Sequence, residues 1–512
     1  MYSYKTLTKK LILFTPLYLL ILISPIMQIL PATAQLSQIN SPANADNNAT
    51  EKIKADQLVA EGEALLKTSD DFFYALSKYI DALTIYRQIA DQTAEEITRK
   101  RFEQILADNQ TVLNRKRDSI RQSKAEFIKQ FPIVPAHNQT ATDLEKIAGE
   151  LGILLHSSTE EAVNQSKKQE LEKIEMSMSQ FLEKQITDPT NQLDKLPNNL
   201  QTYLTNNQDR LTQIRNLIVN GEPLQWKYQP TWQVDDPLPS FLGLVRLQKI
   251  LLLDAIAQKT AGNSQLMQEN LETAWRINQS ITNNPYLIGQ LVGLIGVRFQ
   301  SGVIRKLGDL PAVWSERLLS HDYRSSIIPS LNLEAYMVFD LLDQVKPADL
   351  AESMGEEEIS FLVNAGWEKW SPVSQQNFLS WLGVALYEYG LKTFNRLPDQ
   401  NVCQFKMTEF LQAQNIRQRE LVFLQSFARQ WQKAGQAMIN LELTQRVLEL
   451  VAQKAAGQGL PNTVVASNIC PGTNWVYQQQ PSEMTIEINP QPSEWPGQHT
   501  LPLKFIGKFP PK

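Results

Sequence analysis

Residues 241–260 read FLGLVRLQKILLLDAIAQKT, residues 266–281 read LMQENLETAWRINQSI, and residues 285–307 read PYLIGQLVGLIGVRFQSGVIRKL. The first stretch is strongly apolar, and the second repeats apolar residues every three to four positions, as one face of a helix requires. The third begins with proline, which is common at the first position of a helix. Three successive stretches of this kind predict a compact core of packed helices.

The third stretch carries glycines at three positions of one helix face, Gly289, Gly293 and Gly296. A face of small residues lets a neighbouring helix approach closely, and in a membrane it promotes helix dimerisation. Gln290 and Arg298 interrupt the apolar run, and the unbroken part is too short to cross a bilayer. We therefore interpret this stretch as a buried helix that crosses a neighbour at close range.

Helix-forming residues dominate the rest of the chain, and glycine is scarce, with 21 in 512 residues. Alternation of period two appears only near the C-terminus, where strands are expected. Its apolar positions are Met484, Ile486, Ile488, Leu501, Leu503 and Phe505. The predicted fold class is all-α, built from paired antiparallel helices, with a small C-terminal β meander.

The balance of basic and acidic residues indicates whether a nucleic-acid partner is expected. The chain has 49 basic and 54 acidic residues, a formal net charge of −5, and no dense basic run. Nucleic-acid-binding proteins usually concentrate basic residues on one face. A nucleic-acid partner is therefore not expected. The basic cluster at residues 115–117 is either a binding patch or a solvated helix face interleaved with acids, and we favour the second.

An export signal is predicted at the N-terminus. Lys5, Lys9 and Lys10 precede an apolar stretch at residues 11–30, and Ala32-Thr33-Ala34 supplies the small-x-small pattern of a cleavage site. We predict cleavage between Ala34 and Gln35 and a periplasmic or secreted protein. The alternative is an uncleaved membrane anchor, because about 20 apolar residues can span a bilayer. Contact with the membrane is expected only in that case.

The two cysteines, Cys403 and Cys470, lie in stretches rich in Pro, Asn and Gly. In an oxidising compartment we interpret them as a disulfide that ties the last helices to the C-terminal tail. The alternative is two unpaired thiols, buried as small apolar groups. No metal site and no cofactor are predicted, because the four histidines show no ligand spacing. These are His137, His156, His321 and His499.

One segment near residues 58–90 resembles a tetratricopeptide repeat. Ala75, Tyr79 and Ala82 reproduce the A-x3-F/Y-x2-A spacing of the second helix of such a repeat, and Tyr86 falls where an aromatic often precedes the next repeat. Gly62 departs from the family's first-helix pattern by one residue. The resemblance implies one degenerate hairpin of paired helices, a unit of the kind that repeat proteins use for docking.

A second resemblance covers residues 240–480. The stretches AWRINQSITNNPYLIGQLVGLI and LPNTVVASNICPGTNWVY resemble a loosely defined group of secreted bacterial proteins built from stacked helix pairs. That group implies no activity.

Composition changes along the chain predict its organisation. Residues 221–239 carry four prolines and the aromatics Trp226, Tyr228 and Trp232, which we expect to pack on their own domain rather than to form a ligand platform. The predicted segments are 1–34 signal peptide, 35–50 flexible leader, 51–220 helical arm with the tetratricopeptide-like hairpin, 221–239 linker, 240–460 helical domain, and 461–512 β-rich tail.

No known catalytic motif occurs in the sequence. His321 and Asp322 are adjacent, so on a helix or turn they do not face each other as an acid–base pair. We interpret His321 as a histidine at a helix end. Glu334, Asp340 and Asp343 lie along one helical stretch, and residues 356–358 are acids at a helix start, where the helix dipole favours them.

The sequence therefore predicts a non-catalytic, exported helical scaffold or adaptor that binds a protein or peptide partner in the cell envelope. The alternative is a hydrolase of helical fold that acts on the cell wall or a polysaccharide. That reaction needs two carboxylates at a set separation, which a sequence does not display.

Overall fold

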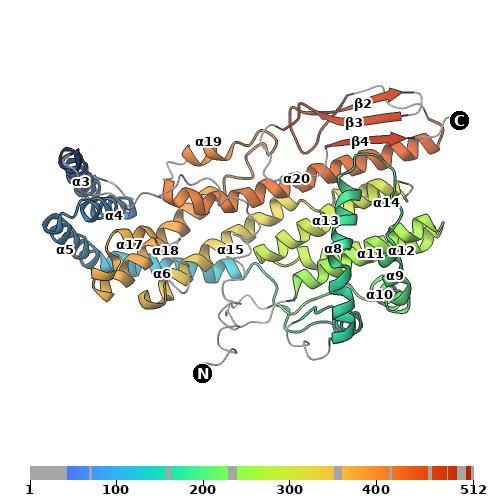
Figure 1. Cartoon of the computed structure of the whole chain (residues 1–512), viewed down its shortest axis with the longest axis horizontal. Coiled ribbons are helices and arrows are strands. Elements are labelled where there is room, and N and C mark those ends of the chain that lie inside the picture. The colour runs from blue at the N-terminus through green and yellow to red at the C-terminus, as the bar shows by residue number, and fades with distance from the viewer. Residues whose placement is uncertain are drawn as a thin grey trace. The chain divides into compact units, whose positions relative to one another are not determined.

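A computed structural model describes residues 43–68, 72–156, 163–228, 239–308, 310–350, 360–413, 418–458, 464–480, 483–492 and 503–508. Its helices and its small C-terminal sheet confirm the predicted all-α class with a β meander (Figure 1). The chain divides into two compact units, which we call unit 1 and unit 2. Unit 1 comprises residues 1–130 and 334–392, and unit 2 comprises residues 131–333 and 393–512. The predicted signal peptide lies outside the described residues.

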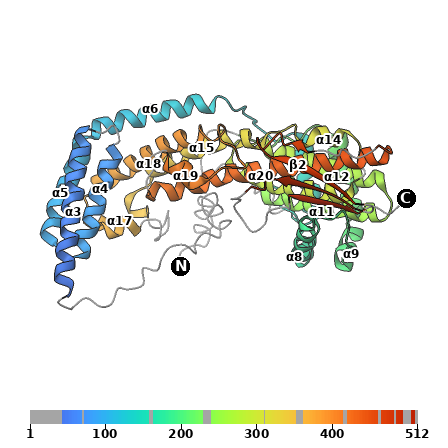
Figure 2. The same ribbon diagram turned by 90° about the horizontal axis from the view of Figure 1, so that it is seen from above.

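Unit 1 begins with three consecutive antiparallel helices that lie side by side, α3 (Ala43–Thr68), α4 (Phe72–Gln88) and α5 (Gln92–Asp108). The next helix, α6 (Gln110–Ile128), runs across them (Figure 2). Its second segment contributes part of α15 (Tyr323–Gln344), η2 (Pro347–Asp349), α17 (Ser360–Asn364), η3 (Trp367–Lys369) and most of α18 (Pro372–Phe394). Since α3 begins at Ala43, it includes the end of the stretch expected to be a flexible leader.

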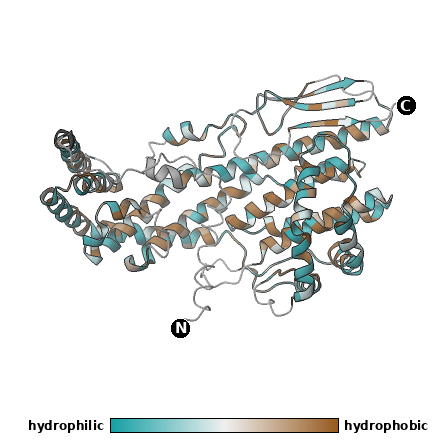
Figure 3. Cartoon of the chain, in the orientation of Figure 1, coloured by the Kyte–Doolittle hydropathy of each residue, from teal (hydrophilic) through white to brown (hydrophobic). Residues whose placement is uncertain are grey.

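Unit 2 is built on the three apolar stretches, which form α11 (Phe241–Thr260), α12 (Ser264–Thr282) and α13 (Leu287–Leu307). The helices before them are α7 (Gln139–Glu150), α8 (Gln165–Thr187), α9 (Asn198–Asn206) and α10 (Gln208–Asn220). After them come α14 (Val313–Leu318), α19 (Met407–Gln412) and the long α20 (Gln418–Ala455). Hydrophobic residues concentrate along α11 and α13 (Figure 3), where the core of this unit lies.

Among the described residues, α13 is long and apolar enough to cross a membrane, but most of it is buried inside the structure. This burial is typical of a core helix, as the sequence predicted. Its glycines allow close approach: a Cβ at Gly296 would lie 2.2 Å from Asn278 Oδ1 and 2.3 Å from Gln248 Oε1. Side chains of α12 and α11 therefore fill the space that a larger residue would need.

Four antiparallel strands form the C-terminal sheet in the order β1 (Val465–Ala466), β2 (Asn474–Gln480), β3 (Glu483–Asn489) and β4 (Lys504–Lys508). Trp475 pairs with Ile488, and Ile486 pairs with Phe505; all four side chains are buried. The buried face follows the alternation seen in the sequence, because successive side chains in a strand point to opposite faces.

The two units differ from the predicted segments because α8 and α10 join the apolar helices of unit 2. Arg246 of α11 binds Glu175 of α8 with hydrogen bonds of 2.7–2.9 Å. Arg215 of α10, 1% exposed, donates a 2.8 Å hydrogen bond to Asp254 of α11, also 1% exposed. These polar contacts join residues of the predicted helical arm, 51–220, to the predicted helical domain, 240–460.

Candidate functional site

Three side chains that the sequence analysis did not connect meet in unit 2: His137, Glu145 and His156. Their nitrogen and oxygen ligand atoms all lie within 4.8 Å of one another. His137 Nε2 is 3.7 Å from Glu145 Oε1, and the two imidazole rings lie edge to face with centroids 4.8 Å apart. We call these residues the His-Glu-His cluster.

Hydrogen bonds to residues 223–228 hold the segment that carries His137. Val134 and Tyr228 exchange backbone hydrogen bonds of 2.8 and 2.7 Å, and the Asn138 amide donates to the Gln225 carbonyl at 3.1 Å. The Lys227 amide donates to His137 Nδ1 at 2.9 Å. The linker predicted from its prolines is thus part of the framework of this cluster.

Helix α7 carries Glu145, and the segment after it leads to His156. Asn138 caps the first turn of α7 by accepting a 3.0 Å hydrogen bond from the Ala141 amide, and Glu145 follows on the buried face. Gly152 ends the helical region in a left-handed conformation with φ +80°, which lets the chain turn toward His156. His156 is 3% exposed and forms an antiparallel bridge with Pro239.

Burial shifts the pKa values of two members of the cluster. It raises the pKa of Glu145, because a carboxylate loses hydration in an apolar site. Burial and the nearby charges of His156 and Lys227 lower the pKa of His137. Two imidazoles and a carboxylate are a donor set that divalent transition metals accept.

This cluster could not be predicted from the sequence, because its members belong to a loop, a helix and a second loop. Metal motifs are recognised by ligands spaced to share one helix face or one turn. Trp226 was the nearest signal: its ring lies edge to face with His137 at 5.6 Å, and its Nε1 donates to Ser280 Oγ at 3.0 Å. Trp226 and Tyr228 are buried, so they pack on their own unit, whereas Trp232 lies outside the described residues.

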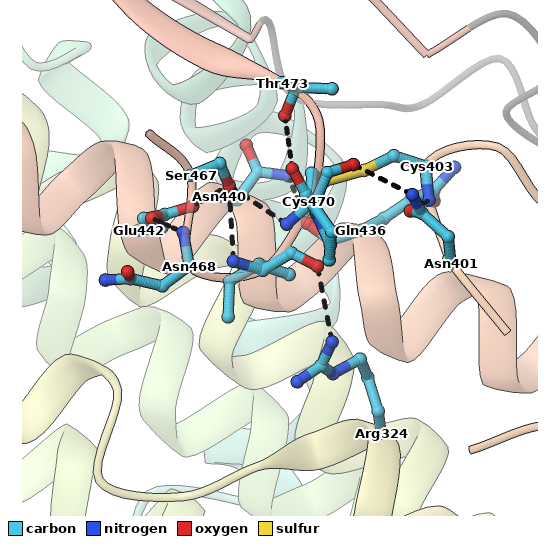
Figure 4. The surroundings of a disulfide bond; sticks show 12 residues. Arg324, Asn401, Cys403, Gln436, Asn440, Glu442, Ser467, Asn468, Cys470 and Thr473 are labelled. Atoms are coloured by element: carbon cyan, nitrogen blue, oxygen red, sulfur yellow. Dashed lines mark hydrogen bonds between the residues drawn. A yellow bond between two sulfur atoms is a disulfide. The ribbon is translucent and has the colours of Figure 1, made fainter. Parts of the chain in front are cut away.

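The predicted cysteine pair lies at disulfide distance, with the Cα atoms of Cys403 and Cys470 5.6 Å apart (Figure 4). Ser467 Oγ accepts a 3.0 Å hydrogen bond from the Cys470 amide and donates a 2.6 Å bond to Glu442. The loop next to Cys403 is joined as well, since Asn401 Nδ2 donates to the Pro471 carbonyl at 2.9 Å. The disulfide therefore connects the loop before α19 with the turn between β1 and β2.

The tetratricopeptide-like residues Ala75, Tyr79 and Ala82 are 0% exposed on α4. The two helices of the hairpin approach closely: a Cβ at Gly62 of α3 would lie 2.7 Å from the Tyr79 ring. Tyr79 OH donates a 2.6 Å hydrogen bond to Glu63 of α3. These residues form a tight antiparallel helix pair, and their role is packing.

The basic cluster of α6 is paired with acids of unit 1. Arg117 and Arg121 donate hydrogen bonds of 3.1 and 2.6 Å to Asp343, which is 1% exposed at its side chain. Lys116 pairs with Glu388, and Lys124 pairs with Asp340. The solvated face that we favoured is therefore not what the structure shows, because Lys116 and Arg117 pair with acids of α18 and α15. Two of the candidate catalytic carboxylates, Asp340 and Asp343, are partners of α6 bases.

The remaining candidate side chains lie in separate places. Glu334 is buried on α15 of unit 1, and burial raises its pKa to about 7. His321 lies between α14 and α15, where its Nε2 is 3.1 Å from Ser326 Oγ, and that hydroxyl donates to Gln290 Oε1 at 3.1 Å. Asp322 binds Arg324 instead of His321. The acids at residues 356–358 and the cleavage residues Ala34 and Gln35 lie outside the described residues.

Comparison with known proteins adds no family: no protein-family model, curated protein or solved structure matches the chain.

Proposed function

We propose that this chain is an exported, non-catalytic helical scaffold that binds a protein or peptide partner in the cell envelope. The observation that carries the proposal is the pair of helices α3 and α4, followed by α5 in the same antiparallel order. Consecutive antiparallel helix pairs are the building unit of repeat proteins, which use their extended faces for docking. The N-terminal signal pattern and the cysteine pair favour a site of action outside the cytoplasm.

The occupied carboxylates of unit 1 support binding rather than hydrolysis. Asp340 and Asp343 are held in ion pairs with bases of α6, so neither is poised beside Glu334 as a second catalytic carboxylate. Glu334 itself has the raised pKa of a general acid, and its conversion to Gln tests the hydrolase directly.

Site-specific photo-crosslinking tests the scaffold. A photoreactive residue at Ile97 of α5, which is 65% exposed, probes the outer surface of the helix pairs. Met176 of α8, 72% exposed in unit 2, is the matched control position. We expect a discrete crosslinked partner from Ile97 in the envelope fraction and none from Met176.

The competing function has a clear signature. If the purified protein cleaves peptidoglycan or a glycan and Glu334→Gln abolishes this activity, the protein is a hydrolase and not a scaffold. Absence of a crosslinked partner at Ile97, together with such turnover, contradicts the proposal.

A further inference from the structure

We propose that His137, Glu145 and His156 form a binding site for one divalent transition-metal cation of the zinc class. This site is independent of the docking function proposed above, because it lies in unit 2 and the helix pairs belong to unit 1. It rests on three features of the described residues: the donor set, a buried carboxylate oxygen without a hydrogen-bond donor, and the framework that holds the donors.

The donors match zinc in kind and in number. Zinc binds imidazole nitrogen and carboxylate oxygen at about 2.0–2.2 Å, and sites with three protein ligands keep a fourth position for water. In a tetrahedral site two such donors lie about 3.3 Å apart. The cluster holds its donor atoms within 4.8 Å, and the His137 Nε2 to Glu145 Oε1 distance is already 3.7 Å. Small side-chain rotations therefore suffice to close the site.

Glu145 supplies the observation that points to a ligand. Its Oε1 is buried and has no hydrogen-bond partner among the described residues. A buried polar atom without a partner costs about 1–3 kcal/mol, and more for a charged group. A cation bound between Glu145 and the two imidazoles removes that cost, since it is the partner the oxygen lacks.

The framework around the donors is built before any cation binds. The ladder between residues 134–138 and 223–228 fixes the backbone of His137, and the Trp226 ring packs against its imidazole. The backbone next to His156 is held as well, because the Ser240 amide donates a 2.7 Å hydrogen bond to the Leu155 carbonyl. A preformed backbone lowers the entropy that a binding event must remove.

Metal binding at this site should change a hydrogen bond of the Lys227 amide. It now donates to His137 Nδ1, so neutral His137 carries its proton on Nε2, the nitrogen that faces Glu145. Metal binding at Nε2 requires that proton on Nδ1 instead, as in most metal-bound histidines. Occupation of the site therefore displaces the Lys227 amide from His137.

Calorimetric titration of the full chain with zinc chloride, under non-reducing conditions after chelator treatment, tests the site. We expect one zinc per chain. Glu145→Gln, which keeps the shape of the side chain, and His137→Asn should each weaken binding by at least about 100-fold. His321→Asn is the control, because His321 bonds Ser326 away from the cluster, and it should bind zinc as the unsubstituted protein does. Equal zinc binding by Glu145→Gln, or none by the unsubstituted protein, overturns the proposal.

A spectroscopic readout separates ligation from folding defects. In protein labelled with nitrogen-15 at lysine, the Lys227 amide signal is assigned by its loss in Lys227→Arg. Zinc at saturation should shift that signal, while the lysines of unit 1 keep theirs. An unchanged Lys227 signal at saturation excludes His137 Nε2 as a ligand and overturns the three-residue site.

Discussion

Among the described residues, Glu334 is the carboxyl group whose pKa burial raises the most. It lies on α15 with 6% exposure, and the described residues provide no ion pair or hydrogen bond to its side chain. Burial raises its pKa from the ordinary 4.5 to about 7. Glu334→Gln keeps the shape of the side chain and removes its ionisation.

The direction of the effect follows from proton binding. Between about pH 4.5 and pH 7 the folded protein holds a proton on Glu334 that the unfolded chain has released. The free energy of unfolding therefore falls as pH rises through this window, and it levels off above about pH 7. A tenfold change in proton affinity is worth about 1.4 kcal/mol, so the full loss is about 3 kcal/mol. Glu334→Gln has no carboxyl group at this position, so its free energy of unfolding does not fall in this window for this reason.

Urea unfolding followed by far-ultraviolet circular dichroism measures the effect. Compared with the unsubstituted protein, Glu334→Gln should be more stable by about 3 kcal/mol at about pH 8 and by about 1 kcal/mol at about pH 5. The control is Glu388→Gln, an exposed carboxylate paired with Lys116, which should change stability by less than about 1 kcal/mol at either pH. A gain from Glu334→Gln that is the same at both pH values would refute the assignment of a buried, neutral Glu334.

Three further perturbations test the packing of both units by thermal unfolding. Gly62→Ala should destabilise the α3–α4 hairpin by about 1–3 kcal/mol, because the new methyl group meets the Tyr79 ring; an unchanged melting temperature would mean that the helices are farther apart. Asp343→Asn should lower the free energy of unfolding by about 2–4 kcal/mol, because Arg117 and Arg121 lose a buried anion. An unchanged melting temperature would show that these ion pairs do not form. Replacing both Cys403 and Cys470 by Ser should lower the free energy of unfolding by up to about 4 kcal/mol, and reductant should lower that of the unsubstituted protein by the same amount. If neither change lowers the melting temperature, the disulfide is not present.

The fold was predictable where the signal is local. The three apolar stretches at residues 241–307 formed helices close to their expected bounds, because a period of 3.6 residues marks a buried helix face wherever the chain places it. The strands at Met484 and Phe505 followed from alternation for the same reason. The helical class and the meander were therefore evident before any contact was known.

Long-range polar contacts were not predictable. The contact of Arg215 with Asp254 draws α10 onto the apolar helices, and nothing in the narrow apolar stripe of α10 marks that partner. The same limit applies to the His-Glu-His cluster, whose members come from three segments without a shared period. The cysteines were an exception, because a chain with two cysteines allows only one intramolecular pair.

The proposed function depends most on export from the cytoplasm in the disulfide-bonded form. Intact-mass spectrometry of the protein from the envelope fraction, with free thiols alkylated before lysis, measures both properties at once. We predict a chain that begins at Gln35 and carries no alkyl group on Cys403 or Cys470. A chain that retains residues 1–34, with both cysteines alkylated and recovered from the cytoplasm, would contradict the account.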